Sequence, residues 1–275
     1  MKSHTLLPVK QVQDQVRNEV MTDIAKAAMA LANVRRGGAR LERFDSDCKP
    51  DSLADAYSIQ DAVVQLFGDL VGGWKVGAMS YRHPSTSAPL LGSRIVPSPA
   101  IVPSDEESLL GIEAEIAFKF ARGFGPRDKP YELNEVLAAV ESVHPVIEIL
   151  ESRFKNILMI DRLSAVADNI SNGYLVTGPI VPNWRDLNLQ FPSLKITNHG
   201  RLFAMGIGNN GGDPYRLLVE LVNHAANDRS GLKAGAIVTT GTCTGILFCE
   251  PGALIVADFK NMGRVEVDFS MNSSK

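Results

Sequence analysis

The sequence predicts an α+β fold in which a helical layer precedes a mostly β domain. Helical periodicity dominates the first seventy residues, and after Gly72-Gly73 the chain changes to short β-rich runs separated by Gly, Pro and Asn. No βαβαβ alternation is present, which argues against a doubly wound sheet. We expect a polar tail over residues 1–18, a helical layer over 19–72 and a β domain over 73–275.

Composition and charge exclude several classes of protein. With 45% hydrophobic and 21% charged residues, the chain has the make-up of an ordinary globular protein. Its net charge of −3 gives no electrostatic reason to expect nucleic acid or a membrane surface as a partner. The three cysteines lack CxxC spacing, so neither a disulfide framework nor a zinc ribbon is indicated. No apolar run approaches the ~18 residues of a membrane span, and we expect a cytoplasmic protein.

Two helices are predicted in the N-terminal layer. The first covers residues 22–34, where apolar residues recur at helical spacing until Gly37-Gly38. The second begins after Ser52, a plausible N-cap followed three residues later by Asp55. Its expected buried stripe is Ala56, Ile59, Val63, Leu66 and Phe67.

The rest of the chain predicts mainly strands. Asn198-His199-Gly200 indicates a hairpin turn, and helices are expected over 132–140 and after Asp213-Pro214. GxxxxGK[ST] does not occur, so the chain has no P-loop signature. The expected strands are 74–79, 111–120, 143–150, 174–177, 194–197, 237–240, 254–258 and 264–269.

Three glutamates stand out in these strands. Residues 111–118 alternate, so Glu113 and Glu115 share the face opposite Ile112, Ala114, Ile116 and Phe118. Glu148 lies in the middle of a strand that is apolar on both faces, where an ionised carboxylate must be paired or bound to a metal. Three such acids would suit Mg²⁺ or Mn²⁺. The alternatives are a solvent-facing strand for the first two and a core salt bridge for Glu148.

Other candidate residues each have a plain structural interpretation. Lys75 has apolar and glycine neighbours and could meet an anion, or it could be a surface lysine at a strand end. The run 239–245 carries four hydroxyls and two glycines, which suits a carboxylate or an ordinary turn. The histidines show neither HxxxH spacing nor a triad arrangement.

Read together, these segments resemble a known family. The motifs are Gly73-Trp74-Lys75-Val76-Gly77, residues 111–118, residues 146–153, Asp168-Asn169-Ile170-Ser171, residues 240–245 and Glu250-Pro251-Gly252. They occur in the order seen in 2-keto-4-pentenoate hydratases and 4-oxalocrotonate decarboxylases of the fumarylacetoacetate hydrolase superfamily. The resemblance covers about residues 25 to 270.

The resemblance implies a mixed β-roll with a helical N-terminal layer and a divalent cation, Mg²⁺ or Mn²⁺, bound by Glu113, Glu115 and Glu148. It implies that Lys75 is catalytic or binds the substrate anion, and that Glu151 lies near the site without being a ligand. It also implies that the substrate is a 2-oxo or 2-hydroxydienoate acid. The pocket for this substrate is expected to be lined by Asp168, Ser171, Thr240 and Thr242.

One departure from the family pattern affects the predicted reaction. Residues 78–104 contain no Asp or Glu, and they offer Arg82, His83 and Arg94 instead. We therefore expect the two arginines to bind substrate and His83 to carry a proton.

The first expectation for the reaction is hydration of a 2-hydroxy-2,4-dienoate, as in meta-cleavage degradation of aromatic compounds. The alternatives are 4-oxalocrotonate-type decarboxylation, hydrolysis of an acylpyruvate, and a non-catalytic homologue that acts as a scaffold for a true enzyme. We also expect a homo-oligomer, with a complex with a pathway enzyme as a further option.

Overall fold

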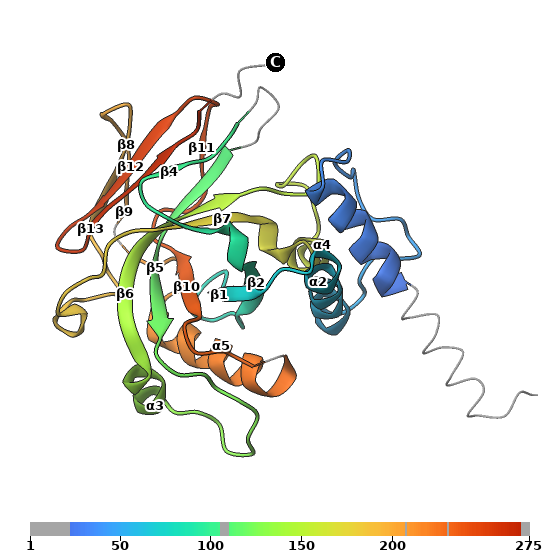
Figure 1. Ribbon diagram of the computed structural model, residues 1–275, viewed down its shortest axis with the longest axis horizontal. Coiled ribbons are helices and arrows are strands. Elements are labelled where there is room, and N and C mark those ends of the chain that lie inside the picture. Colours follow the sequence, from blue (N-terminus) through green and yellow to red (C-terminus); the bar gives the residue numbers. More distant parts are fainter. Residues whose placement is uncertain (1–22, 105–109, 207, 230, 271–275) are drawn as a thin grey trace, which may run out of the picture. The chain divides into compact units, whose positions relative to one another are not determined.

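The computed structural model describes residues 23–104, 110–206, 208–229 and 231–270. It divides into two compact units (Figure 1). Unit 1 contains the described residues up to Gly68 together with Arg153–Asp168, and unit 2 contains Asp69–Ser152 and the described residues from Asn169 onward. The tail expected over residues 1–18 lies outside the described residues. Within the described residues, no helix is long and apolar enough to cross a membrane.

Unit 1 is helical. One helix runs through residues 23–35, followed by α2 (Leu53–Phe67) and α4 (Arg162–Ala167). Ser52 caps α2 in the expected capping box with Asp55, which satisfies otherwise unpaired N–H groups of the first turn. The predicted stripe holds through Val63, but Leu66 is 41% exposed because it lies on the last turn, beyond the residues that face α4.

Unit 2 contains two sheets. The larger has the order β2-β1-β10-β5-β6-β7-β3, with β11 also pairing with β5. Its pairs are both parallel (β1 with β10, β3 with β7) and antiparallel, so the sheet is mixed, as expected. The strands are β1 (Val71–Gly77), β2 (Thr86–Leu91), β3 (Ile95–Pro97), β5 (Leu110–Phe120), β6 (Val140–Leu150), β7 (Asn172–Thr177), β10 (Ile237–Thr242) and β11 (Leu247–Cys249).

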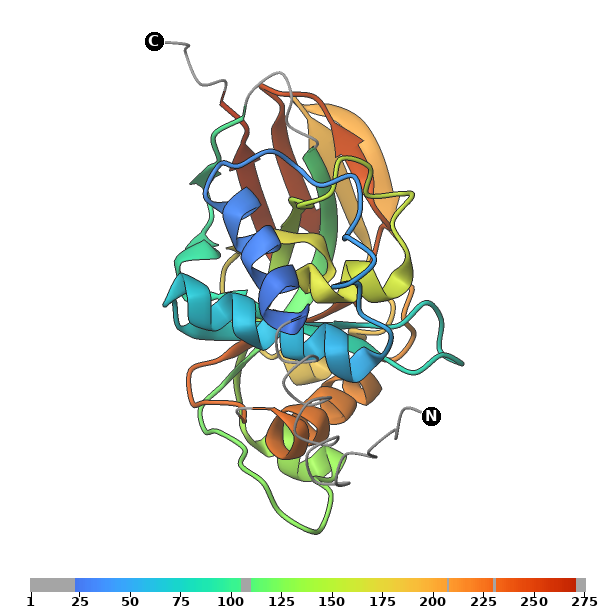
Figure 2. The ribbon, with the colours of Figure 1, turned by 90° about the vertical axis from the view of Figure 1, so that its right-hand side faces the viewer.

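The smaller sheet has the order β4-β13-β12-β8-β9. Its strands are β4 (Ala100–Ile101), β8 (Leu194–Asn198), β9 (Arg201–Gly206), β12 (Leu254–Phe259) and β13 (Gly263–Asp268). The predicted hairpin turn joins β8 to β9, with His199 and Gly200 both at positive φ (48° and 76°). Figures 1 and 2 show this sheet at one end of unit 2 and the helices α3 (Leu133–Ala138) and α5 (Pro214–Asp228) at the other. Short 3₁₀ helices cover Gly92–Arg94 and Trp184–Asp186, and Asn169–Ser171 forms a tight turn before β7.

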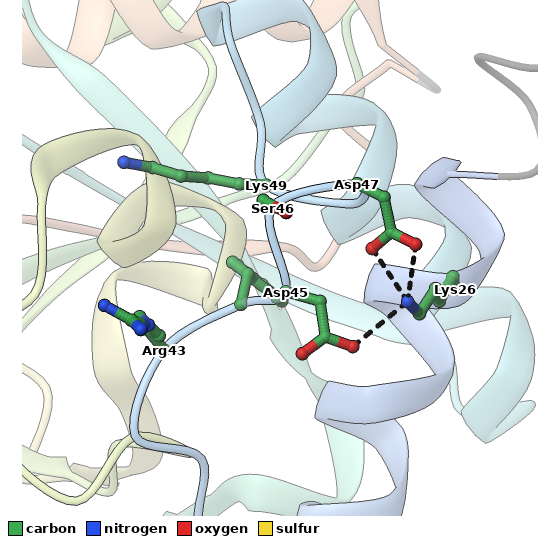
Figure 3. Close-up of a pocket in the computed structure, with 7 residues that line it drawn as sticks. Lys26, Arg43, Asp45, Ser46, Asp47 and Lys49 are labelled. Atoms are coloured by element: carbon green, nitrogen blue, oxygen red, sulfur yellow. Dashed lines mark hydrogen bonds and ion pairs between the residues drawn. The ribbon is translucent and has the colours of Figure 1, made fainter.

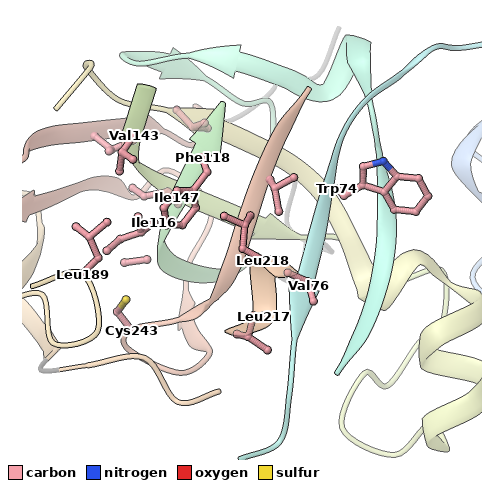
Figure 4. Close-up of a cluster of buried hydrophobic side chains, with 14 of the residues drawn as sticks. Trp74, Val76, Ile116, Phe118, Val143, Ile147, Leu189, Leu217, Leu218 and Cys243 are labelled. Atoms are coloured by element: carbon pink, nitrogen blue, oxygen red, sulfur yellow. The ribbon is translucent and has the colours of Figure 1, made fainter. Parts of the chain in front are cut away.

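The main core of unit 2 uses one face of the β5–β6 pair (Figure 4). Ile112, Ala114, Ile116 and Phe118 are all buried in it, as the alternation in the sequence predicted. Leu217 and Leu218 of α5 pack into the same cluster. The opposite face of β5 carries Glu113 and Glu115, so burying the apolar face also fixes the direction in which the two acids point.

The α+β fold is confirmed, and so is each strand that the sequence predicted, with ends that differ by up to three residues. The prediction missed β2, β9 and α4, and also the short strands β3, β4 and β11. β2 contains Pro89 and lies at the sheet edge, where a proline is tolerated, and α4 has only six residues.

Candidate metal centre

Three carboxylates meet on one face of the larger sheet. β5 and β6 are antiparallel, and their register places Glu113 directly opposite Glu148. Glu115 is two residues along β5 and therefore points to the same side. One carboxylate oxygen from each residue lies within 4.8 Å of the others. Glu148 is fully buried and Glu115 is 2% exposed, so this cluster is not a solvated strand face.

Two of the acids have a hydrogen-bond partner on another strand of the sheet. Lys75 on β1 brings its Nζ atom to 2.5 Å from Oε1 of Glu148, and both side chains are buried. Thr239 on β10 lies beside Lys75 in the parallel register, and its hydroxyl donates to Oε2 of Glu115. The order of β1, β10, β5 and β6 in the sheet therefore brings together two pairs that are 73 positions (Lys75 and Glu148) and 124 positions (Thr239 and Glu115) apart in the chain.

The electrostatics of this cluster favour an additional cation. Burial raises the pKa of Glu113 to about 7, the charge of Glu148 adds to this, and Lys75 and a hydrogen bond from Thr242 oppose it. Burial also raises the pKa of Glu115 well above its usual range, reinforced by Glu148 and Glu113. Burial disfavours the charge on Lys75, but the three carboxylates outweigh it and raise its pKa. One ammonium thus faces three carboxylates, and a further positive charge would stabilise their ionised form.

The donor atoms also fit a divalent metal. Oε2 of Glu148 is buried and has no hydrogen-bond partner among the described atoms, although such atoms are normally paired. An oxygen-only set of carboxylates matches the preference of Mg²⁺, Mn²⁺ and Ca²⁺. Metal binding would explain why this oxygen is buried without a donor.

The hydroxyl turn lies beside the acids. Thr242 is opposite Glu115 in the β10–β5 register, and its hydroxyl is 3.4 Å from that of Thr244. Thr240 is fully buried and donates to the carbonyl of Ile116 at 3.1 Å, which ties its hydroxyl to the strand. Of the two threonines predicted to line the substrate pocket, Thr242 therefore has the more available hydroxyl.

The predicted residues after Lys75 lie in two different settings. Arg82 and His83 are exposed on the β1–β2 loop, where Arg82 donates to the Tyr81 hydroxyl and His83 pairs with Ser80 (2.8 Å). Arg94 stacks 4.4 Å from the Tyr174 ring and is 3.8 Å from Glu151. Within the described residues, no hydrogen bond or ion pair joins any of these three side chains to the carboxylate cluster.

The motif 168–171 is divided between the two units. Asp168 is buried in unit 1, where its carboxylate accepts from the Arg153 side chain and, at 3.0 Å, from the Arg153 backbone N–H. Ser171 is 4% exposed in unit 2, and its carbonyl accepts the N–H of Glu151 at 2.7 Å. Ser171 directly follows Ile170, whose carbonyl accepts a hydrogen bond from Lys75. We therefore keep Ser171 in the proposed site.

Sequence reasoning missed three side chains of the site. Asn172 donates to Oε1 of Glu148 at 2.9 Å, and Thr239 pairs with Glu115. Asn209 donates to the carbonyls of Thr240 and Gly241 and so holds the hydroxyl turn. Thr239 belonged to the hydroxyl run already noted, and the dense Gly-Asn sequence around Asn209 was a usable signal.

A cleft in unit 1 is a separate feature from the carboxylate cluster (Figure 3). It has a volume of about 760 Å³ and is lined by Lys26, Arg43, Phe44, Asp45, Ser46, Asp47 and Lys49. Lys26 is already paired with both aspartates. Its size alone does not make it the functional site, because its acids are exposed and satisfied.

Comparisons with known proteins support the family resemblance. No family model matches the chain. A 4-oxalocrotonate decarboxylase from Pseudomonas putida is 28% identical over 241 residues, which cover 83% of this chain and 90% of the relative. A 2-keto-4-pentenoate hydratase from Burkholderia vietnamiensis is 23% identical over 259 residues, 90% of this chain and 97% of the relative.

Solved structures show the same fold. The 4-oxalocrotonate decarboxylase from Pseudomonas putida G7, complexed with magnesium and adipate, aligns with a TM-score of 0.78 at 23% identity over 98% of this chain and 100% of that chain. Fumarylpyruvate hydrolase from Pseudomonas aeruginosa, in complex with Mn²⁺ and pyruvate, aligns with a TM-score of 0.56 at 15% identity over 72% of this chain and 89% of that chain. The fold and the resemblance predicted from the motifs are both confirmed.

Proposed function

From this relationship to 4-oxalocrotonate decarboxylases and 2-keto-4-pentenoate hydratases, we propose that the chain is a divalent-metal-dependent lyase of 2-oxo acids. Its first proposed reaction is the addition of water to a 2-hydroxy-2,4-dienoate, which gives a 4-hydroxy-2-oxo acid. The observation that carries this proposal is the buried cluster of Glu113, Glu115 and Glu148 beside Lys75.

The three glutamates would hold Mg²⁺ or Mn²⁺ through their oxygens. When bound, the metal would supply Lewis-acid stabilisation of negative charge on the C2 oxygen of a chelating 2-oxo acid. The protein's contribution is a fixed, dry site: Glu148 and Glu115 are almost fully buried, and their remaining oxygens are engaged by Lys75 and Thr239. Preorganised charges in such a site act more strongly than in water.

Lys75 is the proposed contact for the substrate carboxylate. Its ammonium lies at the edge of the cluster, buried, with Glu148 and the carbonyl of Ile170 as acceptors (2.5 and 3.1 Å). A substrate C1 carboxylate held near the same carboxylates needs a positive group to offset the repulsion. Lys75 supplies that charge, and its proton can also be relayed to the substrate.

Hydration to the 4-hydroxy-2-oxo acid requires three events. A proton is added at C5 as the C2 hydroxyl loses its proton and becomes a carbonyl, the hydroxyl of water bonds to C4 while its proton is released, and the resulting enolate takes up a proton at C3. The Thr242 hydroxyl, beside Glu113, is placed to orient water, and His83 with Ser80 is the proposed proton carrier from the β1–β2 loop.

Decarboxylation is the second candidate, and two observations favour it. The β1–β2 loop carries Arg82 and His83 without an acid, which would accept a distal carboxylate. The decarboxylase relative at 28% identity also matches more closely than the hydratase at 23%. In this reaction the C5–C6 bond of a 2-oxohexenedioate breaks, CO₂ leaves, and the electron pair passes through the conjugated chain to the C2 oxygen.

The remaining alternatives have less support. Acylpyruvate hydrolysis needs a water-activating His–Glu pair, and within the described residues the histidines near the site pair with serines or a backbone carbonyl instead. A scaffold without activity would have no need to keep three buried acids and Lys75 together.

Two substrates offered in parallel test the proposal. With Mg²⁺ or Mn²⁺ present, purified protein is given 2-hydroxypentadienoate and 2-oxohexenedioate while dienol absorbance and CO₂ release are followed. Consumption of the dienoate without CO₂ establishes the hydratase, and CO₂ release from the dicarboxylate establishes the decarboxylase. No turnover of either substrate by metal-loaded protein would contradict the proposal. The homo-oligomer and the complex with a pathway enzyme stay predictions.

A further inference from the structure

Three consecutive residues beside the site adopt a left-handed backbone conformation. Asn169, Ile170 and Ser171 have φ values of 51°, 49° and 57°. For non-glycine residues this conformation is uncommon, and for the β-branched Ile170 it is a genuine outlier. Such strain persists only where the surroundings determine it, and it is concentrated at functional sites.

This turn contacts both members of the buried ion pair. The carbonyl of Ile170 accepts from Nζ of Lys75 at 3.1 Å. Two residues later, the side chain of Asn172 donates to Oε1 of Glu148 at 2.9 Å. Lys75 and Glu148 are themselves 2.5 Å apart. One short segment therefore holds a proposed metal ligand and the proposed substrate-binding lysine at the same time.

The turn is anchored at both ends. Asn169 donates to the carbonyl of Pro89 on β2 at 3.3 Å, and the carbonyl of Ser171 accepts the N–H of Glu151 just after β6. Asn169, Ser171 and Asn172 are 1%, 4% and 3% exposed. Because these contacts are buried, the positions of the Ile170 carbonyl and the Asn172 amide are fixed rather than adaptable.

As a result, the two carboxylate oxygens of Glu148 differ in their hydrogen bonding. Oε1 accepts from Lys75 and Asn172, whereas Oε2 has no partner among the described atoms. Rotating the carboxylate out of this plane would break both bonds to Oε1. The amide of Asn172 therefore helps to hold the orientation of the Glu148 carboxylate and leaves its second oxygen unpaired.

We propose that Asn172 is a positioning residue for the metal centre, acting through Glu148 and held in place by the left-handed turn 169–171. It does not touch metal or substrate. This inference rests on the proposed function, because it assigns Oε2 of Glu148 to the cation. Partners of this kind usually contribute 10- to 100-fold to metal affinity.

Mn²⁺ titration calorimetry of Asn172→Leu tests the inference. Leucine keeps the size of the side chain and removes the donor, and we expect Mn²⁺ to bind about 10- to 100-fold more weakly than in the wild type. Thermal melts with and without Mn²⁺ should show a smaller stabilisation by the metal. Asn172→Ser, which keeps a hydroxyl donor, should recover part of the affinity and carries the test if the leucine variant does not fold.

The matched control is Asn223→Leu on α5. Asn223 donates to the carbonyls of Tyr131 and Val219 (3.0 Å each), so its loss should lower the melting temperature while Mn²⁺ affinity stays at the wild-type value. Wild-type affinity in Asn172→Leu would overturn the positioning role alone. Absence of Mn²⁺ binding in the wild type itself would instead overturn the metal centre on which the inference rests.

Discussion

Two lysines in this protein each lie between carboxylates, in opposite surroundings. Lys26 in unit 1 is 2.7 Å from Asp47 and 3.0 Å from Asp45, and all three side chains are at least 45% exposed. Lys75 in unit 2 faces Glu148 at 2.5 Å with side chains that are 8% and 0% exposed. The hydrogen bonds that Lys26 donates to Asp47 and Asp45 raise its pKa, and the three glutamates raise the pKa of Lys75 against the effect of burial.

The difference shows why similar charge groupings have different meanings. Water screens the charges around Lys26, so two acids and one lysine need no further partner. The acids around Lys75 are removed from water, and one lysine cannot neutralise three of them. Burial, and not the number of acids, is the reason to propose the second grouping as a metal centre.

Of the variants that test this comparison, Lys75→Met is expected to have the largest effect. Turnover should fall by at least ~100-fold, because a charge that acts on the substrate is lost. Mn²⁺ affinity should not fall, because the substitution also removes a positive charge beside the carboxylates that would repel the metal ion. Steady-state rates together with calorimetry measure both. A variant with wild-type turnover would show that this lysine has only a structural role.

A pH effect of intermediate size is expected in the metal-free protein. The pKa of Glu113 is about 7 in the folded chain and 4.5 for an ordinary glutamate, so the folded protein retains a proton that the unfolded chain has lost between these values. Stability should therefore decrease as pH rises from 4.5 to about 7, and saturating Mn²⁺ should remove this decrease. Urea unfolding at pH about 5 and about 7.5 measures it.

Glu113→Gln is the control for this measurement, because it removes the titrating group. The decrease in stability with pH should then be smaller than in the wild type. An identical pH dependence in the two proteins would mean that Glu113 does not titrate in this range.

The smallest effect is expected at the exposed lysine. Lys26→Met should leave turnover and Mn²⁺ affinity unchanged and shift the melting temperature by no more than about 2 °C, because its ion pairs are screened by water. Calorimetric melts and a Mn²⁺ titration check this. A loss of metal affinity here would contradict the separation of the two charge groupings.

Local signals in the sequence predicted much of the fold and part of the site. The alternation of residues 111–118 set the direction of Glu113 and Glu115, and Ser52 and Asp213 marked the two long helices whose caps the structure contains. Glu148 was identified because a charge in an apolar strand requires a partner. Each of these depends on residues close together in the chain.

What the sequence did not predict depends on contacts between distant segments. The pairing of Lys75 with Glu148 follows from the sheet order, which no local pattern encodes. The left-handed conformation of Ile170 opposes its own intrinsic preference, so propensity could not reveal it or the role of Asn172. The salt bridge of Glu148, treated as an alternative to a metal, is present together with an unpartnered oxygen.

The most direct test of the central claim is a calorimetric titration of Mn²⁺ into the wild type and into the Glu113→Ala, Glu115→Ala and Glu148→Ala variants, with Glu151→Ala as the control. Glu151 lies just after β6 and pairs weakly with Arg94 at 3.8 Å, outside the cluster. We predict tight binding in the wild type, near-wild-type binding in the control, and loss of tight binding in each of the three variants, because two carboxylates compete poorly with hydration. Unchanged affinity in all three would contradict the claim that these glutamates form a metal centre.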